Sequence, residues 1–274
     1  MKTNYSDWLL VSDIDGTLND KLMNLPAVNK EAISRYVDMG GTFTLCSGRN
    51  LQSLFIHYKK LGIKTPAIFL NGAGIYDFSS SQITYFNPIT TDGEKIIFDI
   101  FSRFKTLQLT VFGADIIYLV KRSCIYGFVI SKIDKLNYKL CKKVSDVPRG
   151  VWGKVSFFGT SKLIKKVQNI IKTEYSDCID CFLTSPFTLE LVNAGVNKGS
   201  GVKKLADILG VSLENTAAIG DYYNDVDMLK TVNHPACCGQ APADIKQISE
   251  YVTCHCNDGA VADFINYLEK NYIL

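Results

Sequence analysis

Apolar and polar residues alternate in blocks along the first third of the chain, in the order that successive strands and helices require. Short apolar runs separate longer stretches whose apolar positions recur at helical spacing, as at Val28, Ala32 and Tyr36. The pattern predicts a strand, a helix, a strand, a helix and a strand over residues 8–12, 26–41, 42–46, 50–61 and 67–70. This β-α-β-α-β order is typical of a parallel sheet with helices on both faces.

The pattern changes near residue 84, where strand-like runs begin to follow one another with few helices between them. In this middle third, helices are expected over residues 92–104 and 162–175, and strands over residues 107–112, 116–120, 154–158, 181–183 and 188–192. Such a mixture predicts a separate α+β unit.

The alternation of strands and helices seen in the first third of the chain resumes at Lys198. Helices are expected over residues 198–209 and 224–230, a strand over residues 216–219, a further run over residues 245–252 and a last helix after Asp258. We therefore predict an α/β fold: a Rossmann-like parallel-sheet core made of residues 1–84 and 190–274, interrupted by an inserted α+β unit at residues 85–189.

Composition and charge fit an ordinary globular protein. Hydrophobic residues make up 47% of the 274 positions and charged residues 21%, which argues against disorder. The net charge of +3 is too small to indicate a nucleic-acid or membrane partner.

The apolar run at residues 8–11 is shorter than the roughly 7–15 residues of a secretory signal, and no apolar run reaches the about 18 residues that span a membrane. We expect a cytoplasmic protein that is a monomer or a homodimer.

The nine cysteines are expected to be reduced thiols, because their number is odd and no export signal precedes them. Two groups have spacings seen in metal sites: Cys178 with Cys181, and Cys254 with His255 and Cys256. A structural zinc site needs four well-placed ligands, and neither group provides them. Ordinary core and surface cysteines are the favoured interpretation, and metal binding at either group stays open.

Polar and acidic residues gather where the predicted parallel strands end. Asp13–Leu18 follow the first strand, Ser47–Asn50 follow the second, and Gly220–Asp225 follow a later one, while Asn193–Gly199 precede a helix. Ligands of open parallel sheets bind at the carboxyl ends of the strands. Four acidic residues, a lysine, a serine and several glycines are thus expected to converge on one edge of the sheet.

Each of these residue types has a task in phosphoryl transfer. A carboxylate can act as a covalent nucleophile, and Asp13 and Asp15 point the same way, so that the second can give a proton to the leaving oxygen. Clustered carboxylates repel one another unless a hard cation such as Mg²⁺ lies among them. A lysine neutralises charge on the transferred group, while a serine hydroxyl and loop N–H groups bind its oxygens.

The ordered motifs resemble those of the haloacid dehalogenase (HAD) superfamily. The sequence has Asp-x-Asp-Gly-Thr-Leu at 13–18, Ser-Gly-Arg at 47–49, Asn-Lys-Gly at 197–199 and Gly-Asp-x-x-Asn-Asp at 220–225. The insert lies between the second and third motifs, which resembles the Cof-like phosphatases with a type IIB (C2B) cap. The resemblance covers nearly the whole chain. One departure is Cys238–Pro242, where the family more usually has Gly-Asn-Ala-Pro.

The resemblance implies a role for each matching residue. Asp13 is expected to be the nucleophile and a Mg²⁺ ligand, Asp15 the general acid and base that also offers its backbone carbonyl to the metal, and Asp221 the third ligand. Asp225 is expected to orient Lys198 or to hold a metal-bound water. The phosphate is expected to contact Ser47, Gly48, Lys198, Asn224 and the backbone of Ile14. Two more residues are expected near the pocket without a catalytic role: Arg49 and Asn71.

The implied function is a Mg²⁺-dependent phosphatase that hydrolyses a small phosphorylated metabolite through an aspartyl-phosphate. Two alternatives stay open: a phosphomutase of the phosphomannomutase type, which shares this step, and a non-catalytic phosphate-sensing protein. Asp15 disfavours the sensor, because binding alone does not require a second aspartate. The insert is expected to close over the site and contact the leaving group. Its core is expected to contain the aromatic residues Tyr118, Tyr126, Phe128 and Trp152.

Overall fold

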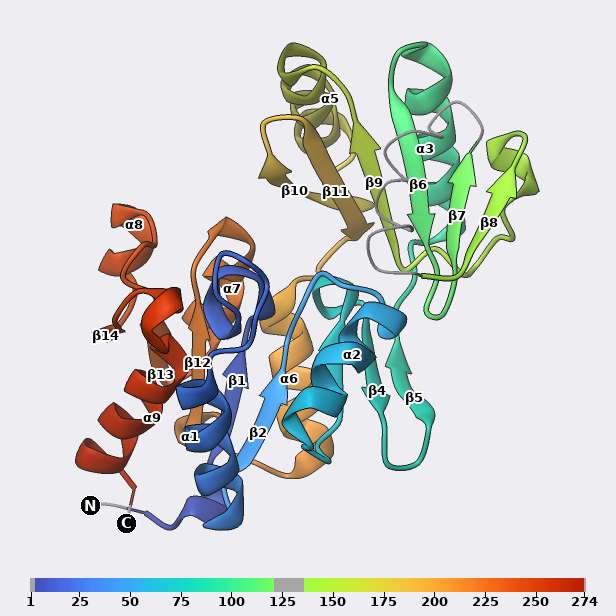
Figure 1. Ribbon diagram of the computed structural model, residues 1–274. Coiled ribbons are helices and arrows are strands. Elements are labelled where there is room, and N and C mark those ends of the chain that lie inside the picture. The colour runs from blue at the N-terminus through green and yellow to red at the C-terminus, as the bar shows by residue number, and fades with distance from the viewer. Residues whose placement is uncertain (1–2, 121–135, 274) are drawn as a thin grey trace.

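The computed structural model describes residues 3–120 and 136–273, and the strands of these residues form three sheets (Figure 1). The central sheet has five parallel strands in the order β14-β13-β12-β1-β2. In that order they span Tyr251–Val252, His234–Cys237, Thr216–Gly220, Leu9–Ser12 and Thr42–Leu45. The strands β1 and β12, which the acidic motifs follow, are therefore neighbours in the middle of the sheet.

Strand β1 is buried on both faces, as its unbroken apolar run predicts. Leu10 belongs to the core on one face, whereas Leu9 and Val11 belong to the core on the other. Side chains alternate along a strand, so successive residues pack on opposite layers of helices. One layer contains α1 and α9 and the other contains α6 and α7, which span Ala27–Asp38, Ala260–Asn271, Lys198–Leu209 and Val226–Thr231.

The third predicted strand does not join this sheet as expected. After α2 (Leu51–Leu61), β3 (Ala67–Phe69) touches β2 through a single parallel bridge and pairs antiparallel with β4 (Gly74–Asp77), which pairs with β5 (Gln82–Phe86). Residues 70–72 cause the difference, because all three have positive φ (51°, 57° and 98°) and reverse the chain directly after β3. The sequence pattern did not predict the β4–β5 hairpin.

A six-stranded sheet with two helices on one face is formed by the middle third of the chain (Figure 1). Its strand order is β10-β11-β9-β6-β7-β8, antiparallel except for the last pair. In that order the strands span Ile179–Ser185, Thr188–Asn193, Lys154–Phe158, Gln108–Phe112, Ile117–Val120 and Tyr138–Cys141. The helices are α3 (Thr91–Arg103) and α5 (Ser161–Glu174).

Alternation along these strands separates an apolar face from a polar one. The apolar positions of β6, β9 and β11 share one core with α3 and α5: Leu109, Val111, Val155, Phe157, Leu189 and Leu191. The residues between them, Thr110, Ser156 and Glu190, are aligned across the three strands by the register and lie on the opposite face. The six-stranded sheet thus presents polar side chains on the face that α3 and α5 leave uncovered.

The chain crosses between the parallel sheet and the six-stranded sheet at two adjacent points. Asn193 Nδ2 donates to Asn87 Oδ1 at 3.1 Å, and the Thr90 N–H donates to Asn193 Oδ1 at 3.3 Å. The boundaries expected from the sequence, at residues 84–85 and 189–190, fall inside β5 and β11.

Three further predictions from the sequence can be compared with the structure: the core aromatic residues of the insert, the run over residues 245–252, and the lack of a membrane span. Tyr118 and Trp152 lie in the core of the insert, whereas Tyr126 and Phe128 fall outside the described residues. The run over residues 245–252 is not one element, because it contains the end of α8 (Ala243–Gln247) and then β14. Within residues 3–120 and 136–273, no helix is both long and apolar enough to cross a membrane.

Candidate active site

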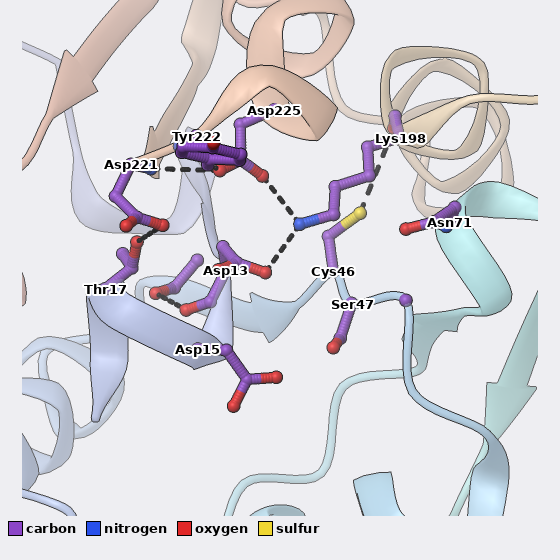
Figure 2. A network of polar contacts seen from close by, with 12 residues as sticks. Asp13, Asp15, Thr17, Cys46, Ser47, Asn71, Lys198, Asp221, Tyr222 and Asp225 are labelled. Carbon is purple, nitrogen blue, oxygen red and sulfur yellow. Dashed lines mark hydrogen bonds and ion pairs between the residues drawn. The ribbon is translucent and has the colours of Figure 1, made fainter. Parts of the chain in front are cut away.

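The four motifs meet at the carboxyl end of the central strands (Figure 2). Asp13 directly follows β1 and Asp221 directly follows β12. Asp225 ends a short 3-10 helix in the next turn, and Lys198 is the first residue of α6. Residues from distant parts of the sequence therefore come together because their strands and helices end at one edge of the sheet.

Lys198 joins two carboxylates in the interior of the protein. Its side chain is 0% exposed, and Nζ donates to Asp13 Oδ1 at 2.5 Å and to Asp225 Oδ1 at 2.6 Å. Burial acts to lower the pKa of this ammonium, but the two carboxylates outweigh burial and hold the pKa well above its ordinary value. Lys198 therefore stays positively charged and fixes the orientation of Asp13.

Three carboxylates stand close enough to share a cation. One oxygen from each of Asp13, Asp221 and Asp225 lies within 4.8 Å of the others. Burial raises the pKa of Asp221 to about 7, and the charge of Asp225 adds to the rise. A divalent cation among these groups would favour their ionised forms, and the charge of three carboxylates less that of the Lys198 ammonium is the two negative charges that one such cation would balance. The oxygen-only donor set fits Mg²⁺, which prefers carboxylate ligands.

Asp225 has other partners for its oxygens. Oδ1 accepts from Lys198, while Oδ2 accepts from the backbone N–H of Asp221 at 2.9 Å and of Tyr222 at 3.1 Å. Gly220 leaves the space for this carboxylate, since a Cβ at Gly220 would lie 2.5 Å from Asp225 Cγ. The contacts favour a role in fixing the turn that carries Asp221 and in orienting Lys198.

Asp15 is turned away from the carboxylate cluster (Figure 2) and paired with Arg49. Arg49 Nε donates to Asp15 Oδ2 at 2.8 Å and Nη2 donates to Oδ1 at 2.7 Å, while Nη1 donates to Ser53 Oγ at 2.5 Å. Burial acts to raise the pKa of Asp15, but the hydrogen bonds and charge of Arg49 hold it below its usual value. In this arrangement Asp15 is an ionised hydrogen-bond acceptor.

A cavity of about 490 Å³ opens on these residues. Six residues of the predicted site line it: Asp13, Asp15, Ser47, Gly48, Asp221 and Asn224. Arg49 and Asn71 line it as well, as the sequence led us to expect. Lys198 is not on the cavity wall but contacts Asp13 from within the protein, and the side chain of Ile14 is buried in the core. Ile14 can therefore offer a ligand only its backbone.

Two charged residues of the six-stranded sheet, Lys154 and Glu190, also line the cavity, and the sequence analysis did not anticipate them. Lys154 Nζ donates to Glu190 Oε1 at 2.5 Å and to the backbone oxygen of Gly48 at 2.7 Å. The available signal was Glu190 itself, a carboxylate placed between Leu189 and Leu191 in a strand whose neighbours are apolar. Isolated charges in such strands are rare unless they are paired.

Gln240 is a third residue that the sequence analysis did not place in the site. Its Nε2 donates to the backbone oxygen of Gly16 at 2.6 Å, and its Oε1 accepts from the Cys256 N–H at 3.1 Å. Gly16 has φ of +80°, and a Cβ there would lie 2.5 Å from Asp221 Oδ2. The segment that departs from the usual family pattern, Cys238–Pro242, therefore supports the loop that packs against Asp221.

A carboxylate fixed by a buried lysine, beside a carboxylate set that fits a divalent cation, is the arrangement of an α/β phosphoryl-transfer enzyme. The sequence profile of the haloacid dehalogenase-like hydrolases matches residues 10–265, and the chain belongs to this family. Membership confirms the resemblance, and the similar solved structures confirm the predicted fold class. Together with the relatives that are named as phosphatases, it identifies the chain as a phosphatase of the HAD superfamily.

Relatives match over nearly their full lengths. A protein of Buchnera aphidicola (subspecies Schizaphis graminum) is 30% identical over 97% of this chain and 96% of its own length. The pyridoxal phosphate phosphatase YbhA of Escherichia coli is 21% identical over 94% of this chain and 97% of its own. A solved structure of a subclass IIB sugar phosphatase of the HAD superfamily has a TM-score of 0.82 at 20% identity and covers 95% of this chain and 98% of its own.

Proposed function

We propose that this phosphatase hydrolyses a small phosphomonoester with Mg²⁺, through a phosphoryl group carried on Asp13. The observation that carries the proposal is the setting of Asp13, a buried carboxylate that lines the cavity, bonded to Lys198 and within reach of Asp221. The names of two similar proteins, a pyridoxal phosphate phosphatase and a sugar phosphatase, support a small phosphorylated metabolite as the substrate.

The reaction has two steps in this proposal. An oxygen of Asp13 first bonds to phosphorus while the bond between phosphorus and the leaving-group oxygen breaks, and Asp15 gives that oxygen a proton. Water then attacks the phosphorus and gives a proton to Asp15, and the bond to Asp13 breaks to release phosphate. Asp15 must exchange Arg49 for the leaving-group oxygen to act as the acid, because the ion pair favours its ionised form.

The other site residues bind the phosphate and the cation. Mg²⁺ would be held by Asp13, Asp221 and the backbone carbonyl of Asp15, and it would supply positive charge to the phosphate oxygens. Lys198 offsets negative charge at Asp13 as the phosphoryl group arrives. Four further contacts to the phosphate are assigned to Ser47, Gly48, Asn224 and the backbone of Ile14.

The insert, residues 85–189 by sequence pattern, acts as a cap over a core of residues 1–84 and 190–274 in this proposal. Support comes from the cavity wall, because Phe112 and Lys154 of the six-stranded sheet line the same cavity as Asp13. A wall of this kind contacts the leaving group and keeps bulk water from the reacting phosphorus.

Thermal unfolding with and without Mg²⁺ tests the metal site separately from turnover. Binding to the folded protein raises its stability, by about 2.7 kcal/mol at a hundredfold excess over the dissociation constant. Mg²⁺ should therefore raise the Tm of the wild type but not that of Asp221→Asn, and a chelator should abolish hydrolysis of p-nitrophenyl phosphate. Full activity in excess chelator, with no Tm response to Mg²⁺, would rule out the proposed metal dependence.

A further inference from the structure

The loop that follows β2 is held from two separate sheets. Ser47 and Arg49 exchange backbone hydrogen bonds with residues 68–71, which form the end of β3 and the turn after it, at 3.0 to 3.1 Å. The carbonyl oxygen between them, that of Gly48, accepts instead from Lys154 Nζ of the six-stranded sheet at 2.7 Å. The ends of the loop are thus held by its neighbours in sequence, and its middle is held by the insert.

Lys154 is engaged on several sides at this position. Its side chain is 5% exposed, and Nζ also donates to Glu190 Oε1 at 2.5 Å and lies 4.7 Å from the centre of the Phe112 ring. Glu190 Oε2 in turn accepts from Asn71 Nδ2 at 2.7 Å. Because the ammonium already contacts a carbonyl, a carboxylate and a ring face, its contacts favour holding the loop over binding a phosphate directly.

The Gly48 carbonyl belongs to the peptide unit that also contains the Arg49 N–H. In a planar trans peptide the C=O and the N–H point in opposite directions, so a contact that fixes the oxygen also sets the direction of the N–H. Here the Arg49 N–H donates to Ser47 Oγ at 3.2 Å. Lys154 and the Ser47 hydroxyl are therefore connected through one rigid peptide unit.

This connection leaves the Ser47 hydroxyl as a donor. A hydroxyl oxygen that accepts from an N–H keeps its own proton for another partner. Within residues 3–120 and 136–273, Ser47 Oγ donates to no protein atom. Ser47 lines the cavity with Asp13, and its hydroxyl oxygen points toward the space beside the Asp15 carboxylate (Figure 2). The proton is therefore available to an oxygen of a bound phosphate.

We propose that Lys154 is a positioning residue for phosphate binding, because it holds the Gly48–Arg49 peptide so that the Ser47 hydroxyl donates to the phosphate. The charge of the ammonium also polarises this peptide and strengthens the hydrogen bonds that follow it. The inference rests on the proposed phosphatase reaction. It adds that the insert assists the phosphate end of the substrate, whatever the leaving group is.

Inhibition by inorganic phosphate measures this effect without a leaving group. The assay is hydrolysis of p-nitrophenyl phosphate with Mg²⁺, in Glu190→Gln and in the same variant carrying Lys154→Met. Glu190→Gln alone keeps the Gly48 contact, so the inhibition constant Ki should not rise. Adding Lys154→Met removes that contact without leaving a buried carboxylate unpaired, and Ki should rise about tenfold. Lys154→Arg in the wild-type background keeps a cationic donor and should retain most of the phosphate binding.

A double-mutant cycle with Ser47→Ala tests the path through the hydroxyl. In the Glu190→Gln background, Lys154→Met should raise Ki about tenfold when Ser47 is present and less than about twofold in Ser47→Ala. The ratio of kcat/KM for p-nitrophenyl phosphate to that for n-propyl phosphate should not change when Lys154 is removed, because both esters share the phosphate. The control is Ser156→Ala, which lines the same cavity from the same strand and should leave the Ki of phosphate unchanged. Thermal unfolding checks that each variant is folded.

Four results would overturn the inference. An unchanged Ki after the loss of Lys154 would show that the contact does not assist phosphate binding. A tenfold rise already in Glu190→Gln would assign the effect to the ion pair. Equal rises with and without the Ser47 hydroxyl would show that Lys154 does not act through it. A changed preference between the two esters would make Lys154 a contact to the leaving group.

A different result bears on the reaction itself. Failure of the wild type to hydrolyse either ester with Mg²⁺ would overturn the proposed function, and this inference with it. Normal turnover with any of the four results above would overturn the inference alone.

Discussion

Asp13 and Asp15 stand two residues apart and have very different surroundings. Asp13 is buried, and burial raises its pKa well above the ordinary value against the opposing charge of Lys198. Asp15 is paired with Arg49, which lowers its pKa. Two carboxylates whose surroundings shift their pKa values in opposite directions can take different tasks in one reaction. Taken alone, the two shifts oppose the proposed tasks, because the nucleophile must be ionised and the proton donor protonated. A cation beside Asp13 would favour its ionised form, and Asp15 must leave Arg49 to take up a proton.

The acid role of Asp15 predicts a loss of activity that depends on the leaving group. An alkoxide needs a proton as it leaves, whereas p-nitrophenolate does not. Asp15→Asn should therefore lower kcat/KM for n-propyl phosphate about 10²-fold or more, and lower that for p-nitrophenyl phosphate much less. Steady-state kinetics on both esters at fixed Mg²⁺ measures the difference. Equal losses would mean that Asp15 only helps to hold the metal or the loop.

The part of the site that lies in the four sequence motifs could be predicted from the sequence. Asp13, Asp221 and Lys198 follow strands or open a helix, and the rule for parallel sheets is enough to bring such residues together. The Glu190–Asn71 contact could not be predicted, because it joins two separate sheets that the motifs do not relate. The Asp15–Arg49 pair was also missed, because Asp15 was expected as the general acid and base and Arg49 only near the pocket, with no contact predicted between them.

Among the elements, the turn after β3 shows where the sequence pattern was insufficient. The apolar run at residues 67–70 indicates a strand, and a strand is present, but Leu70 and Asn71 adopt positive φ without being glycine. Their N–H groups donate to the Arg49 and Ser47 oxygens, and the next residue, Gly72, packs against the start of α6, so contacts distant in sequence hold the turn. Helices such as α6 and the strands β1 and β12 were predictable because their periodicity is set locally.

The same turn predicts a large stability difference between two glycine substitutions. Gly72 has φ of +98°, and a Cβ there would lie 2.1 Å from the backbone oxygen of Asn197. Gly62 also has positive φ (+68°), but a Cβ there meets nothing within 4 Å. Gly62→Ala should lower the free energy of unfolding by about 1 kcal/mol, and Gly72→Ala by about 3 kcal/mol or more. Denaturant unfolding of both variants measures the contrast, and equal losses would contradict the close approach of the turn to α6.

At the scale of the whole molecule, the two sheets have largely separate cores. Residues of α3 and α5 pack with the six-stranded sheet in one cluster, while the parallel sheet supplies two others. Four strand residues of the six-stranded sheet are exceptions, because they pack in a cluster of the parallel-sheet unit: Phe112, Ile117, Leu119 and Val192. The proposed cap therefore contacts the core through apolar residues as well as through the Lys154 network.

The proposed division into a catalytic core and an inserted cap can be tested by a deletion. Residues 88–193 are removed, and Asn87 is joined to Ala194 by a short Gly-Ser linker. The two ends lie close together, because Asn193 contacts Asn87, and all five parallel strands stay outside the cut. The truncated protein should keep Mg²⁺-dependent hydrolysis of p-nitrophenyl phosphate at a reduced rate and lose the preference among alkyl phosphate esters that the wild type shows. Circular dichroism and solubility are the controls. A soluble truncation that kept the wild-type preference would show that the insert does not select the substrate.

The central claim is that the phosphoryl group passes through Asp13, and trapping it during turnover is the most direct test. The enzyme is mixed with excess p-nitrophenyl phosphate and Mg²⁺, quenched in acid within one turnover, digested and examined by mass spectrometry. The account predicts a phosphate on the peptide that contains Asp13, absent in Asp13→Asn, whose turnover should fall at least about 10³-fold. An unmodified Asp13 peptide, together with substantial turnover by Asp13→Asn, would contradict the account.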